Sequence, residues 1–332
     1  MTFVSLRKVA AAGAVAATLA LALTACSGGG AAQTGNGDAK AAGGNGSSGY
    51  KIAMITHETP GDTFWDKIRA GAQQAAKDTG VTLTYSNDPQ ADKQAQLIQT
   101  AIDSKVDGIA TTLVTPDALA GSVAAAKKAG IPLVGFNSGI DQFKQLGALM
   151  YFGSDENLAG NTVGEKLAAE GIKHPLCVIQ AAGSVALEAR CTGVKEKLAG
   201  TENIQVNGSD DSAVVSSLQA KLTQDPSIDA IVTLGAPIAL DAIKAQAQDG
   251  SKSKLVTFDL NADAAQAIKD GKIEFSIDQQ PYVQGYMAVT SLFLYLKNGN
   301  DIGGGKAVLT GPSIVDSSNI DKILPFTKKN TR

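Results

Sequence analysis

Residues 51–76 read KIAMITHETPGDTFWDKIRAGAQQAA, and this stretch decides the fold. Its first segment, Lys51–Thr56, is short and apolar, which predicts a buried strand. After a polar loop, Phe64–Thr79 places Ile68 and Ala75 on one face at helical spacing. The stretch therefore predicts a buried strand that leads through a loop into a helix.

The same unit of strand and helix repeats along the chain. In the first half, further strands are predicted at 81–86, 108–113 and 131–137, with helices at 92–104 and 116–129. The pattern restarts with strands at 150–153, 176–180, 204–207, 230–234 and 254–259, helices at 159–170, 185–198, 213–224, 237–249 and 282–297, and short apolar runs at 307–309 and 313–315. This alternation predicts parallel sheets covered by helices on both faces. We expect an α/β fold of two Rossmann-like, doubly wound lobes.

Composition excludes several classes of protein. The chain has 332 residues with 29 basic and 32 acidic side chains, so a basic nucleic-acid binder is excluded. Three cysteines do not make a disulfide scaffold, and two histidines leave little for a His-based metal cluster or a His-dependent catalytic apparatus. A hydrophobic content of 44% is enough for a real core.

The N-terminal residues predict an export signal. Arg7 and Lys8 precede an apolar run at 9–23, which is too short for a permanent membrane span. The following Leu-Thr-Ala-Cys at 23–26 resembles the lipobox of bacterial lipoproteins, so we expect residues 1–25 to be removed and Cys26 to be lipidated. The alternative is an ordinary secretory signal that is cut near Ala25. Residues 26–49 are then the lipidated Cys and a flexible tether of small polar residues.

Loops after the predicted strands are the expected place for a binding site. In open parallel sheets the crevice lies at the carboxyl ends of the strands, so the loops after Thr56, Asn137, Gln180, Leu234 and Phe258 are the first to inspect. The first of these loops ends in two aromatic residues, Phe64 and Trp65, at the start of a helix. Aromatic rings stack on the C–H faces of sugars and polyols. The alternative is that one of the two rings only packs beneath its helix.

Five motifs in order resemble one known family. They are KIAMITHETPGDTFWDKIRAGAQQAA at 51–76, VDGIATTLVTPDAL at 106–119, AGIPLVGFNSG at 129–139, YFGSDENLAG at 151–160, and LVTFDLNADAAQAIKDGKIEFSIDQQPYVQGYMA at 255–288. They resemble the ribose-type sugar-binding proteins of bacterial ABC importers, the type I periplasmic binding proteins. The resemblance implies a three-segment hinge near Ser154, Gln280 and Leu309. It also implies a first lobe of 50–154 plus 280–308 and a second lobe of 155–279 plus 309–332.

The resemblance also implies a set of ligand-binding residues. The stacking aromatics correspond to Phe64 and Trp65, the hinge amide corresponds to Gln279, and an arginine of the family falls at or beside Arg190. Departures from the ribose pattern at Ser138, Glu188 and Gly235 indicate another pentose, a hexose or a sugar alcohol in place of D-ribose. The predicted ligand-binding residues are Thr56, His57, Asp62, Phe64, Trp65, Asn137, Ser138, Glu188, Arg190, Gly235, Asp259 and Gln279.

Four of these residues have simpler alternatives. Asn137 would suit a left-handed turn before Gly139, and Glu188 would complement the positive end of its helix. Arg190 would serve as a solvated surface residue, and Asp259 as a helix N-cap. The sequence leaves these alternatives open.

No motif in the sequence supports catalysis, a cofactor or a metal. Gly303-Gly304-Gly305-Lys306 lacks the Ser or Thr and the strand-to-helix setting of a phosphate loop. His57 and His174 are far apart, with no Cys or clustered carboxylates expected around them, and no Gly-x-Ser-x-Gly motif is present. The predicted export signal and tether occupy the place of the DNA-binding segment of related repressors. We therefore expect neither an enzyme nor a nucleic-acid-binding protein.

The two remaining cysteines, Cys177 and Cys191, are predicted to form a disulfide. An exported chain folds in an oxidising setting, and the predicted strand and returning helix bring the two residues to a similar depth. Two buried free thiols are the alternative.

The interpretation as a whole is a solute-binding protein of a sugar or sugar-alcohol importer. We expect a monomer that is lipid-anchored outside the bacterial cell membrane and delivers its ligand to an ABC permease and its ATPase. A signalling receptor for a sugar-like compound and an exported sugar-acting enzyme are the alternatives.

Overall fold

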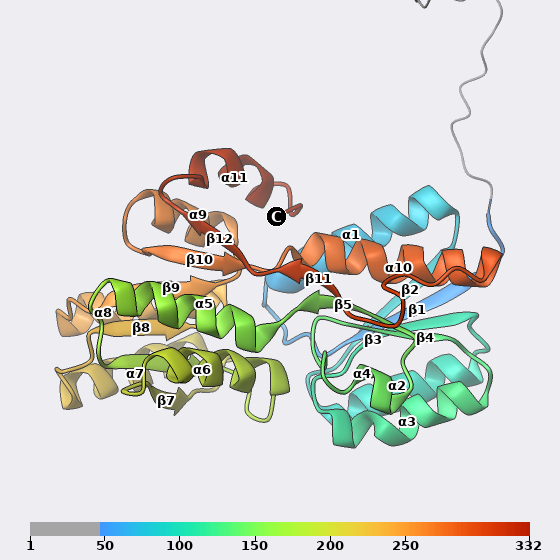
Figure 1. The fold of residues 1–332 in the computed structure, drawn as a ribbon, viewed down its shortest axis with the longest axis horizontal. Coiled ribbons are helices and arrows are strands. Elements are labelled where there is room, and N and C mark those ends of the chain that lie inside the picture. The colour runs from blue at the N-terminus through green and yellow to red at the C-terminus, as the bar shows by residue number, and fades with distance from the viewer. Residues whose placement is uncertain (1–46) are drawn as a thin grey trace, which may run out of the picture. The chain divides into compact units, whose positions relative to one another are not determined.

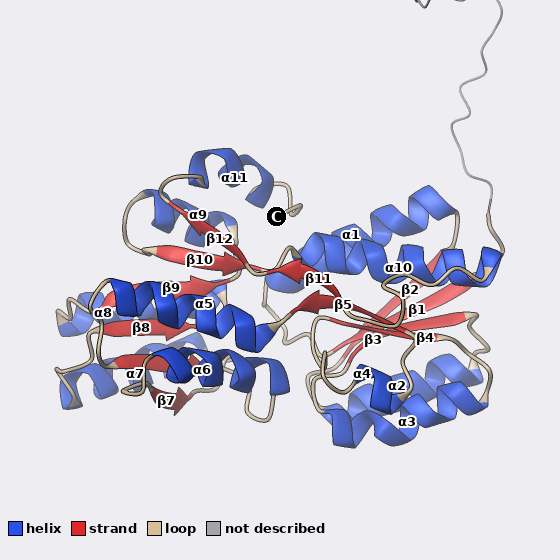
Figure 2. Cartoon of the chain, in the orientation of Figure 1, coloured by secondary structure: helices blue, strands red, loops and turns tan. Residues whose placement is uncertain are grey.

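The structure is a computed structural model that describes residues 47–332. It contains two six-stranded sheets, each covered by helices on both faces (Figures 1 and 2). The first sheet has the order β11-β5-β4-β3-β1-β2 and the second has β12-β10-β9-β8-β6-β7. All pairings are parallel except β10 with β12. The predicted α/β fold with two doubly wound lobes is confirmed.

The first lobe contains the first sheet and the helices against it. Its strands are β1 (Lys51–Thr56), β2 (Thr82–Asn87), β3 (Gly108–Thr112), β4 (Leu133–Phe136), β5 (Met150–Ser154) and β11 (Val308–Gly311). Its helices are α1 (Phe64–Thr79), α2 (Ala91–Asp103), α3 (Pro116–Lys128), α4 (Phe143–Leu146) and α10 (Pro281–Asn298). Helices α1 and α10 cover one face, and α2, α3 and α4 cover the other (Figure 1).

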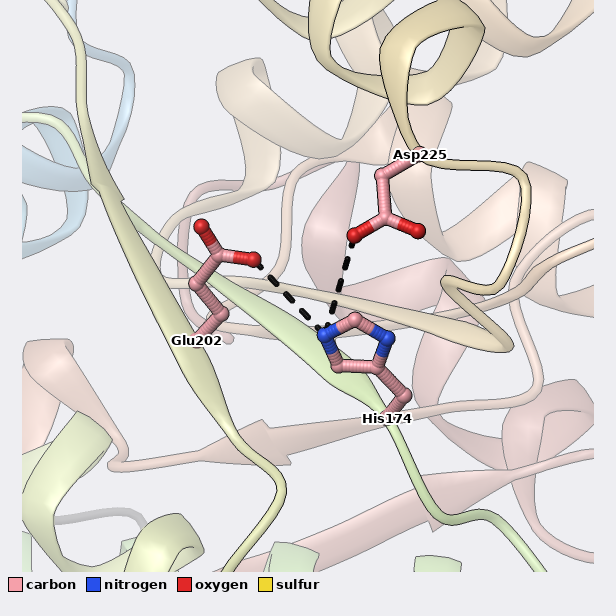
Figure 3. A group of neighbouring side chains, drawn as sticks. All are labelled: His174, Glu202 and Asp225. Atoms are coloured by element: carbon pink, nitrogen blue, oxygen red, sulfur yellow. Dashed lines mark ion pairs between the residues drawn. The ribbon is translucent and has the colours of Figure 1, made fainter.

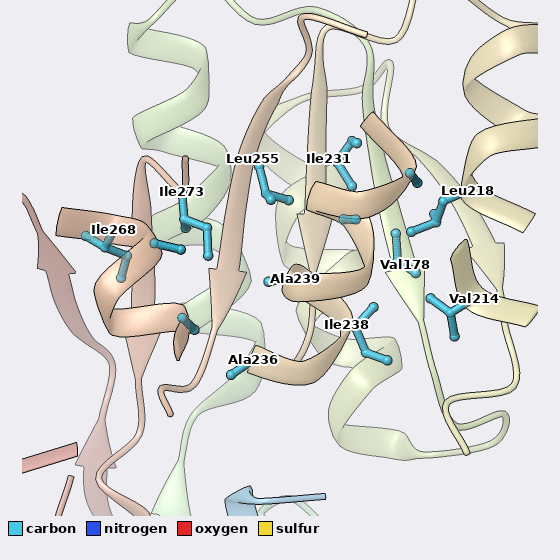
Figure 4. Close-up of a cluster of buried hydrophobic side chains, with 14 of the residues drawn as sticks. Val178, Val214, Leu218, Ile231, Ala236, Ile238, Ala239, Leu255, Ile268 and Ile273 are labelled. Carbon is cyan, nitrogen blue, oxygen red and sulfur yellow. The ribbon is translucent and has the colours of Figure 1, made fainter. Parts of the chain in front are cut away.

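The second lobe repeats this plan. Its strands are β6 (Pro175–Ile179), β7 (Glu202–Gln205), β8 (Ala230–Thr233), β9 (Lys254–Phe258), β10 (Phe275–Asp278) and β12 (Ser313–Asp316). Its helices are α5 (Glu156–Ala169), α6 (Val185–Lys197), α7 (Asp211–Gln224), α8 (Ala236–Asp249), α9 (Ala262–Lys269) and α11 (Ile320–Thr327). Figure 4 shows one of its cores, where Ile231 and Leu255 of the sheet face Ala239 of α8. Burial of such aliphatic side chains stabilises the fold by about 1.5–3 kcal/mol each.

Glycines allow one helix pair in each lobe to pack backbone to backbone. A Cβ added to Gly71 of α1 would lie 2.0 Å from the carbonyl oxygen of Tyr282 in α10. In the second lobe, a Cβ on Gly160 of α5 would lie 2.1 Å from the carbonyl oxygen of Arg190 in α6. Both distances are far below van der Waals contact, so only glycine fits at these positions.

The chain crosses between the two sheets three times. It leaves the first sheet after Ser154, returns to it after β10 through Gln279 and Gln280, and leaves it again at Pro312 between β11 and β12. The predicted third crossing near Leu309 is therefore wrong by a few residues. Strand β11 continues the first sheet to Gly311 by pairing with β5, and this carries the chain past Leu309.

Hydrogen bonds tie two of these crossings together. The Thr310 hydroxyl donates to the carbonyl of Gln279 at 2.7 Å, and the Gln280 side-chain amide donates to the carbonyl of Thr310 at 2.8 Å. Gln280 itself has a left-handed backbone, with φ of 56°. The second and third crossings are thus coupled to each other.

The predicted signal peptide, Cys26 and most of the predicted tether lie outside the described residues. At the start of the described part, Ser48 donates its backbone N–H to the carbonyl of Gly80 at 2.8 Å, although the sequence placed this residue in the tether. Among residues 47–332, no helix has the length and apolar character needed to cross a membrane.

Candidate functional site

A cavity of about 710 Å³ lies at the carboxyl ends of the strands, between the two lobes. All five loops singled out from the sequence contribute to it. The predicted residues that line it are His57, Asp62, Phe64, Trp65, Asn137, Arg190, Gly235, Asp259 and Gln279. The structure thus brings together nine predicted residues that are far apart in the sequence.

Three other predicted residues do not line this cavity. Thr56 is buried, and its hydroxyl lies 3.0 Å from the Tyr85 hydroxyl. Ser138 is buried, and its hydroxyl has no hydrogen-bond partner among the described residues. Glu188 is half-buried on α6. The structure gives these three residues no contact with the cavity.

Two direct contacts join the lobes beside the cavity. The backbone N–H of Val185, at the start of α6, donates to the carbonyl of Val114 in the first lobe at 3.3 Å. The Asn261 side-chain amide donates to the Thr63 hydroxyl at 3.3 Å. The lobes therefore touch each other without a ligand as intermediary.

A row of polar side chains crosses the floor of the cavity from one lobe to the other. Asn137 Nδ2 donates to Gln279 Oε1 at 3.2 Å, and Gln279 Nε2 donates to Asp259 Oδ1 at 2.8 Å. A second amide, Gln284, donates to Gln279 Oε1 at 2.9 Å. All four side chains are buried, so the row is held in one arrangement.

Asp259 is the acidic end of this row. The N-cap of α9 is Asn261, whose side chain accepts the N–H of Ala264, so the alternative role of Asp259 as a cap is wrong. Burial raises the pKa of Asp259 to about 7, and Arg190 and the hydrogen bond from Gln279 offset part of that rise. A carboxyl group with this pKa changes its charge near neutral pH.

Arg190 is held on three sides. Its Nε donates to Glu156 Oε2 at 2.6 Å, its Nη1 donates to the carbonyl of Leu234 at 2.9 Å, and its guanidinium lies 4.5 Å above the Phe258 ring. Its side chain is 3% exposed, so the alternative of a solvated surface residue is wrong. Among the described residues, Nη2 has no hydrogen-bond partner. This fixed guanidinium therefore has donors left for a ligand.

Two aromatic rings form the wall that the first lobe contributes. Phe64 and Trp65 meet edge to face with centroids 5.1 Å apart, and His57 meets Trp65 in the same way at 4.7 Å. Burial lowers the pKa of His57 to about 3, so its ring is neutral and bonds through Nδ1 to the Thr112 hydroxyl at 2.8 Å. Burial also raises the pKa of Asp62, which accepts the N–H of Phe64 at 3.0 Å.

Sequence reasoning missed one wall of the cavity. The loop after β7 contributes Asn207, Asp210 and Asp211, together with the glycine and serines between and after them. The signal for this loop was present, because a run of turn residues follows a predicted strand. The same rule about strand ends would have found it.

His174 lies at the other end of the second sheet, before β6, and the structure corrects one expectation about it. Two carboxylates, Glu202 and Asp225, lie around it although none were expected (Figure 3). They come from distant parts of the chain, which the topology brings together at the amino ends of neighbouring strands.

The two remaining cysteines also meet in the second lobe. Cys177 of β6 and Cys191 of α6 form a disulfide with their Cα atoms 5.8 Å apart. Both are fully buried in the core between β6 and α6. Cys191 directly follows Arg190, so the bridge fixes the helix that carries this guanidinium to the sheet.

Known sequences and structures resemble this chain along most of its length. Residues 52–301 match the periplasmic binding protein domain. The xylose/arabinose-binding protein XylF of Sulfolobus acidocaldarius is 26% identical, over 83% of this chain and 73% of its own length. The ribose import binding protein RbsB of Haemophilus influenzae is 27% identical, over 74% of this chain and 85% of its own.

A solved structure is more similar. It is a carbohydrate transporter from Acidothermus cellulolyticus 11B in complex with myo-inositol, which is 54% identical with a TM-score of 0.84. The match covers 85% of this chain and 99% of the other. The resemblance drawn from the five sequence motifs is confirmed, and the chain belongs to the family of the periplasmic binding protein domain.

Proposed function

We propose that the protein is the solute-binding component of an ABC-type importer and that it captures a small, neutral polyhydroxylated compound between its lobes. The observation that carries the proposal is that an aromatic surface and a hydrogen-bonding surface line the same cavity. Phe64 and Trp65 offer aromatic faces, while the row from Asn137 to Asp259 and the guanidinium of Arg190 offer hydrogen-bond partners. Sugars and cyclic polyols combine apolar C–H faces with a rim of hydroxyls, and this surface suits them.

The charges of the cavity favour a neutral ligand. Four carboxylates line it, from Asp62, Asp210, Asp211 and Asp259, and Arg190 is the only Lys or Arg among its lining residues. Asp210 and Asp211, together with Asp259 where it is ionised, would repel a sugar phosphate or sugar acid. A neutral ring of hydroxyls can donate to the carboxylates and accept from Arg190.

Among neutral ligands, myo-inositol is the first candidate. The solved structure bound to it shares 54% of its residues with this chain. Of the three departures from the ribose pattern, only Gly235 lines the cavity, and its lack of a side chain there agrees with a ligand other than D-ribose. Each wrongly placed hydroxyl would leave a buried polar group of the site unpaired, which gives such a site strong discrimination.

The other proposals concern location and partners. The family is extracytoplasmic, and we place this protein on the outer face of a bacterial membrane, held by lipid on Cys26. We propose that it works as a monomer, without catalysis or a cofactor, and delivers its ligand to a permease that a cytoplasmic ATPase powers.

Replacing Cys26 with Ala should release the protein from the membrane while the folded body still binds ligand. Retention of that variant on salt-washed membranes would contradict the lipid anchor.

Isothermal titration calorimetry with myo-inositol, D-ribose, D-xylose and D-allose tests the binding proposal. We expect one site per chain and the tightest binding for myo-inositol. Asp259→Ala should weaken it at least tenfold, because a charge-assisted hydrogen bond in a closed cavity contributes about 1.5–3 kcal/mol. Lys252→Ala, at an exposed turn before β9, should leave the affinity unchanged. Binding of none of the four compounds, or parental affinity in a folded Asp259→Ala variant, would refute the assignment. Recovery of chemically altered ligand would refute the non-catalytic role.

A further inference from the structure

We propose that His174, Glu202 and Asp225 form a binding site for a divalent transition metal of the Zn²⁺ class. The site is separate from the cavity between the lobes. His174 precedes β6, Glu202 opens β7, and Asp225 follows α7, so all three lie at the amino ends of strands whose carboxyl ends face the cavity. Figure 3 shows the imidazole directed between the two carboxylates.

The spacing of the donor atoms suits one metal ion. His174 Nε2 lies 3.6 Å from Glu202 Oε2 and 4.0 Å from Asp225 Oδ2, and one donor atom from each residue lies within 4.8 Å of the others. Zinc bonds of about 2.0–2.2 Å in tetrahedral geometry place neighbouring donors about 3.4 Å apart. The two distances from His174 would have to shorten by about 0.2 and 0.6 Å, and the two carboxylate oxygens, which lie within 4.8 Å of each other, would have to approach by up to about 1.4 Å, which partly exposed side chains can do by rotation. Water would complete the coordination.

The hydrogen bonds around Ser227 fix the tautomer of His174. The Ser227 hydroxyl lies 2.6 Å from Asp225 Oδ1 and 2.8 Å from His174 Nδ1. A carboxylate only accepts, so the single hydroxyl proton goes to Asp225, and Ser227 must accept the proton of Nδ1–H. In the neutral ring, Nε2 therefore carries a lone pair that faces two carboxylate oxygens. Three electron-rich atoms therefore converge, and the nearest cation, Lys221, lies 3.9 Å from Asp225 Oδ2 and makes its close contact with the other oxygen of Glu202, so the three atoms form a receptor for a cation.

The backbone holds the histidine in this position. The Asp229 carboxylate accepts the N–H of Lys173 at 2.6 Å and the N–H of His174 at 2.9 Å. Ser227 then orients the ring from behind, as partners outside the coordination sphere do in metal sites. Neither of these fixing groups uses Nε2.

One cation already lies beside the site. Lys221 Nζ is 2.8 Å from Glu202 Oε1 and 3.9 Å from Asp225 Oδ2. Its close contact is with the oxygen of Glu202 that does not face His174, so lysine and metal can occupy the cluster together. Its positive charge nevertheless opposes the metal, which gives the proposal a distinctive consequence. Removing Lys221 should strengthen metal binding.

Calorimetry with Zn²⁺ and visible absorption with Co²⁺, on protein without a histidine tag at pH 7.5, test the site. We expect one bound ion and a Co²⁺ absorption band. His174→Ala should weaken binding more than tenfold and abolish the band, and Ser227→Ala should weaken binding about tenfold. Lys221→Met should tighten binding. Glu202→Gln should weaken it, whereas Glu165→Gln, at a matched ion pair on exposed α5, should not.

Binding that is equally tight in the parent and in His174→Ala would overturn the proposal, and so would a Lys221→Met variant that binds no more tightly than the parent. Calorimetry with myo-inositol on each variant separates this result from the proposed function. The metal site lies outside the cavity, so a correctly folded His174→Ala variant keeps the parental response to the polyol, whatever that response is.

Discussion

Asn137 and Asp259 occupy equivalent positions in the two lobes, and both have a left-handed backbone. Their φ angles are 64° and 63°. Each follows the fourth strand of its lobe in chain order, and each donates its backbone N–H at 2.9 Å to the strand alongside, to Phe152 in one lobe and Ile277 in the other. This shared turn directs both side chains into the cavity, where Gln279 joins them. Asn and Asp tolerate the left-handed region better than most residues, so the same backbone requirement accounts for the residue at each end of the polar row.

The raised pKa of Asp259 predicts a pH-dependent stability. In the unfolded chain this carboxyl titrates near 3.9, and in the folded protein near 7, so the folded state binds more protons between these values. Its contribution to the free energy of unfolding should fall as pH rises from about 4 to about 7, by at most about 1.4 kcal/mol per pH unit. In urea unfolding of the ligand-free protein, Asp259→Asn should gain stability over the parent between pH 5 and pH 8. The exposed Asp263→Asn serves as the control, and an equal gain there would contradict the prediction.

Gln279 should be required for tight binding although it carries no charge. Gln279→Met keeps the size of the side chain and removes the hydrogen bonds that position Asn137 and Asp259. We expect affinity for the cognate polyol to fall at least tenfold, with a smaller change in thermal stability. Calorimetry against Gln266→Met, an exposed glutamine on α9, provides the comparison. Equal affinities in the two variants would show that the row has no part in binding.

A methyl group outside the cavity should disturb binding through Arg190. Gly160→Ala would place a Cβ against the carbonyl of Arg190 and push α6 away from α5. We expect both lower stability and weaker ligand binding, because the guanidinium would lose its alignment with Glu156 and Leu234. Gly121→Ala on α3, where a new Cβ meets open space, should instead be neutral or stabilising by up to about 1 kcal/mol. Thermal unfolding and calorimetry on both variants decide whether the close packing matters.

The disulfide should stabilise the second lobe and support Arg190. Cys177 and Cys191 are 14 residues apart, and closing a loop of this length contributes about 3 kcal/mol in the chain-entropy model. Urea unfolding with and without a reductant should differ by about this amount in the parent. It should not differ in a variant with both cysteines changed to Ala. An unchanged unfolding midpoint in the reduced parent would count against the bridge.

The sequence predicted the repeated βαβ pattern well because buried parallel strands are continuous apolar runs. It failed where that pattern is absent. Strand β7 lies at the edge of its sheet with alternate residues exposed, so its start at Glu202 was placed two residues late, and Asn207 seemed part of the strand. Strand β10 was missed because Ser276 and Asp278 interrupt its apolar residues, although all four are buried. Helix α11 was missed, and it contains Pro325.

The site was predictable where it follows strand ends, and hidden where it depends on pairs from distant segments. The loops that carry Asp62, Asn137 and Asp259 follow strands and were found by that rule, and the family resemblance then singled out the three residues. Glu156, which holds Arg190, follows β5, but nothing in its local sequence indicates a buried partner on α6. The cluster around His174 was missed for the same reason, since its members come from three separate segments.

The position of Gln279 has a kinetic consequence. This residue belongs to the second crossing between the lobes, and its side chain is also the centre of the polar row. Any rotation that parts the lobes at this crossing also turns the amide away from Asn137 or Asp259. A bound solute would therefore lose its contact with Gln279 in the same event that opens its exit. The residence time of the solute should therefore be set by how often the lobes open. Hinge motions occur on the microsecond-to-millisecond scale, and a higher population of the closed state makes opening rarer.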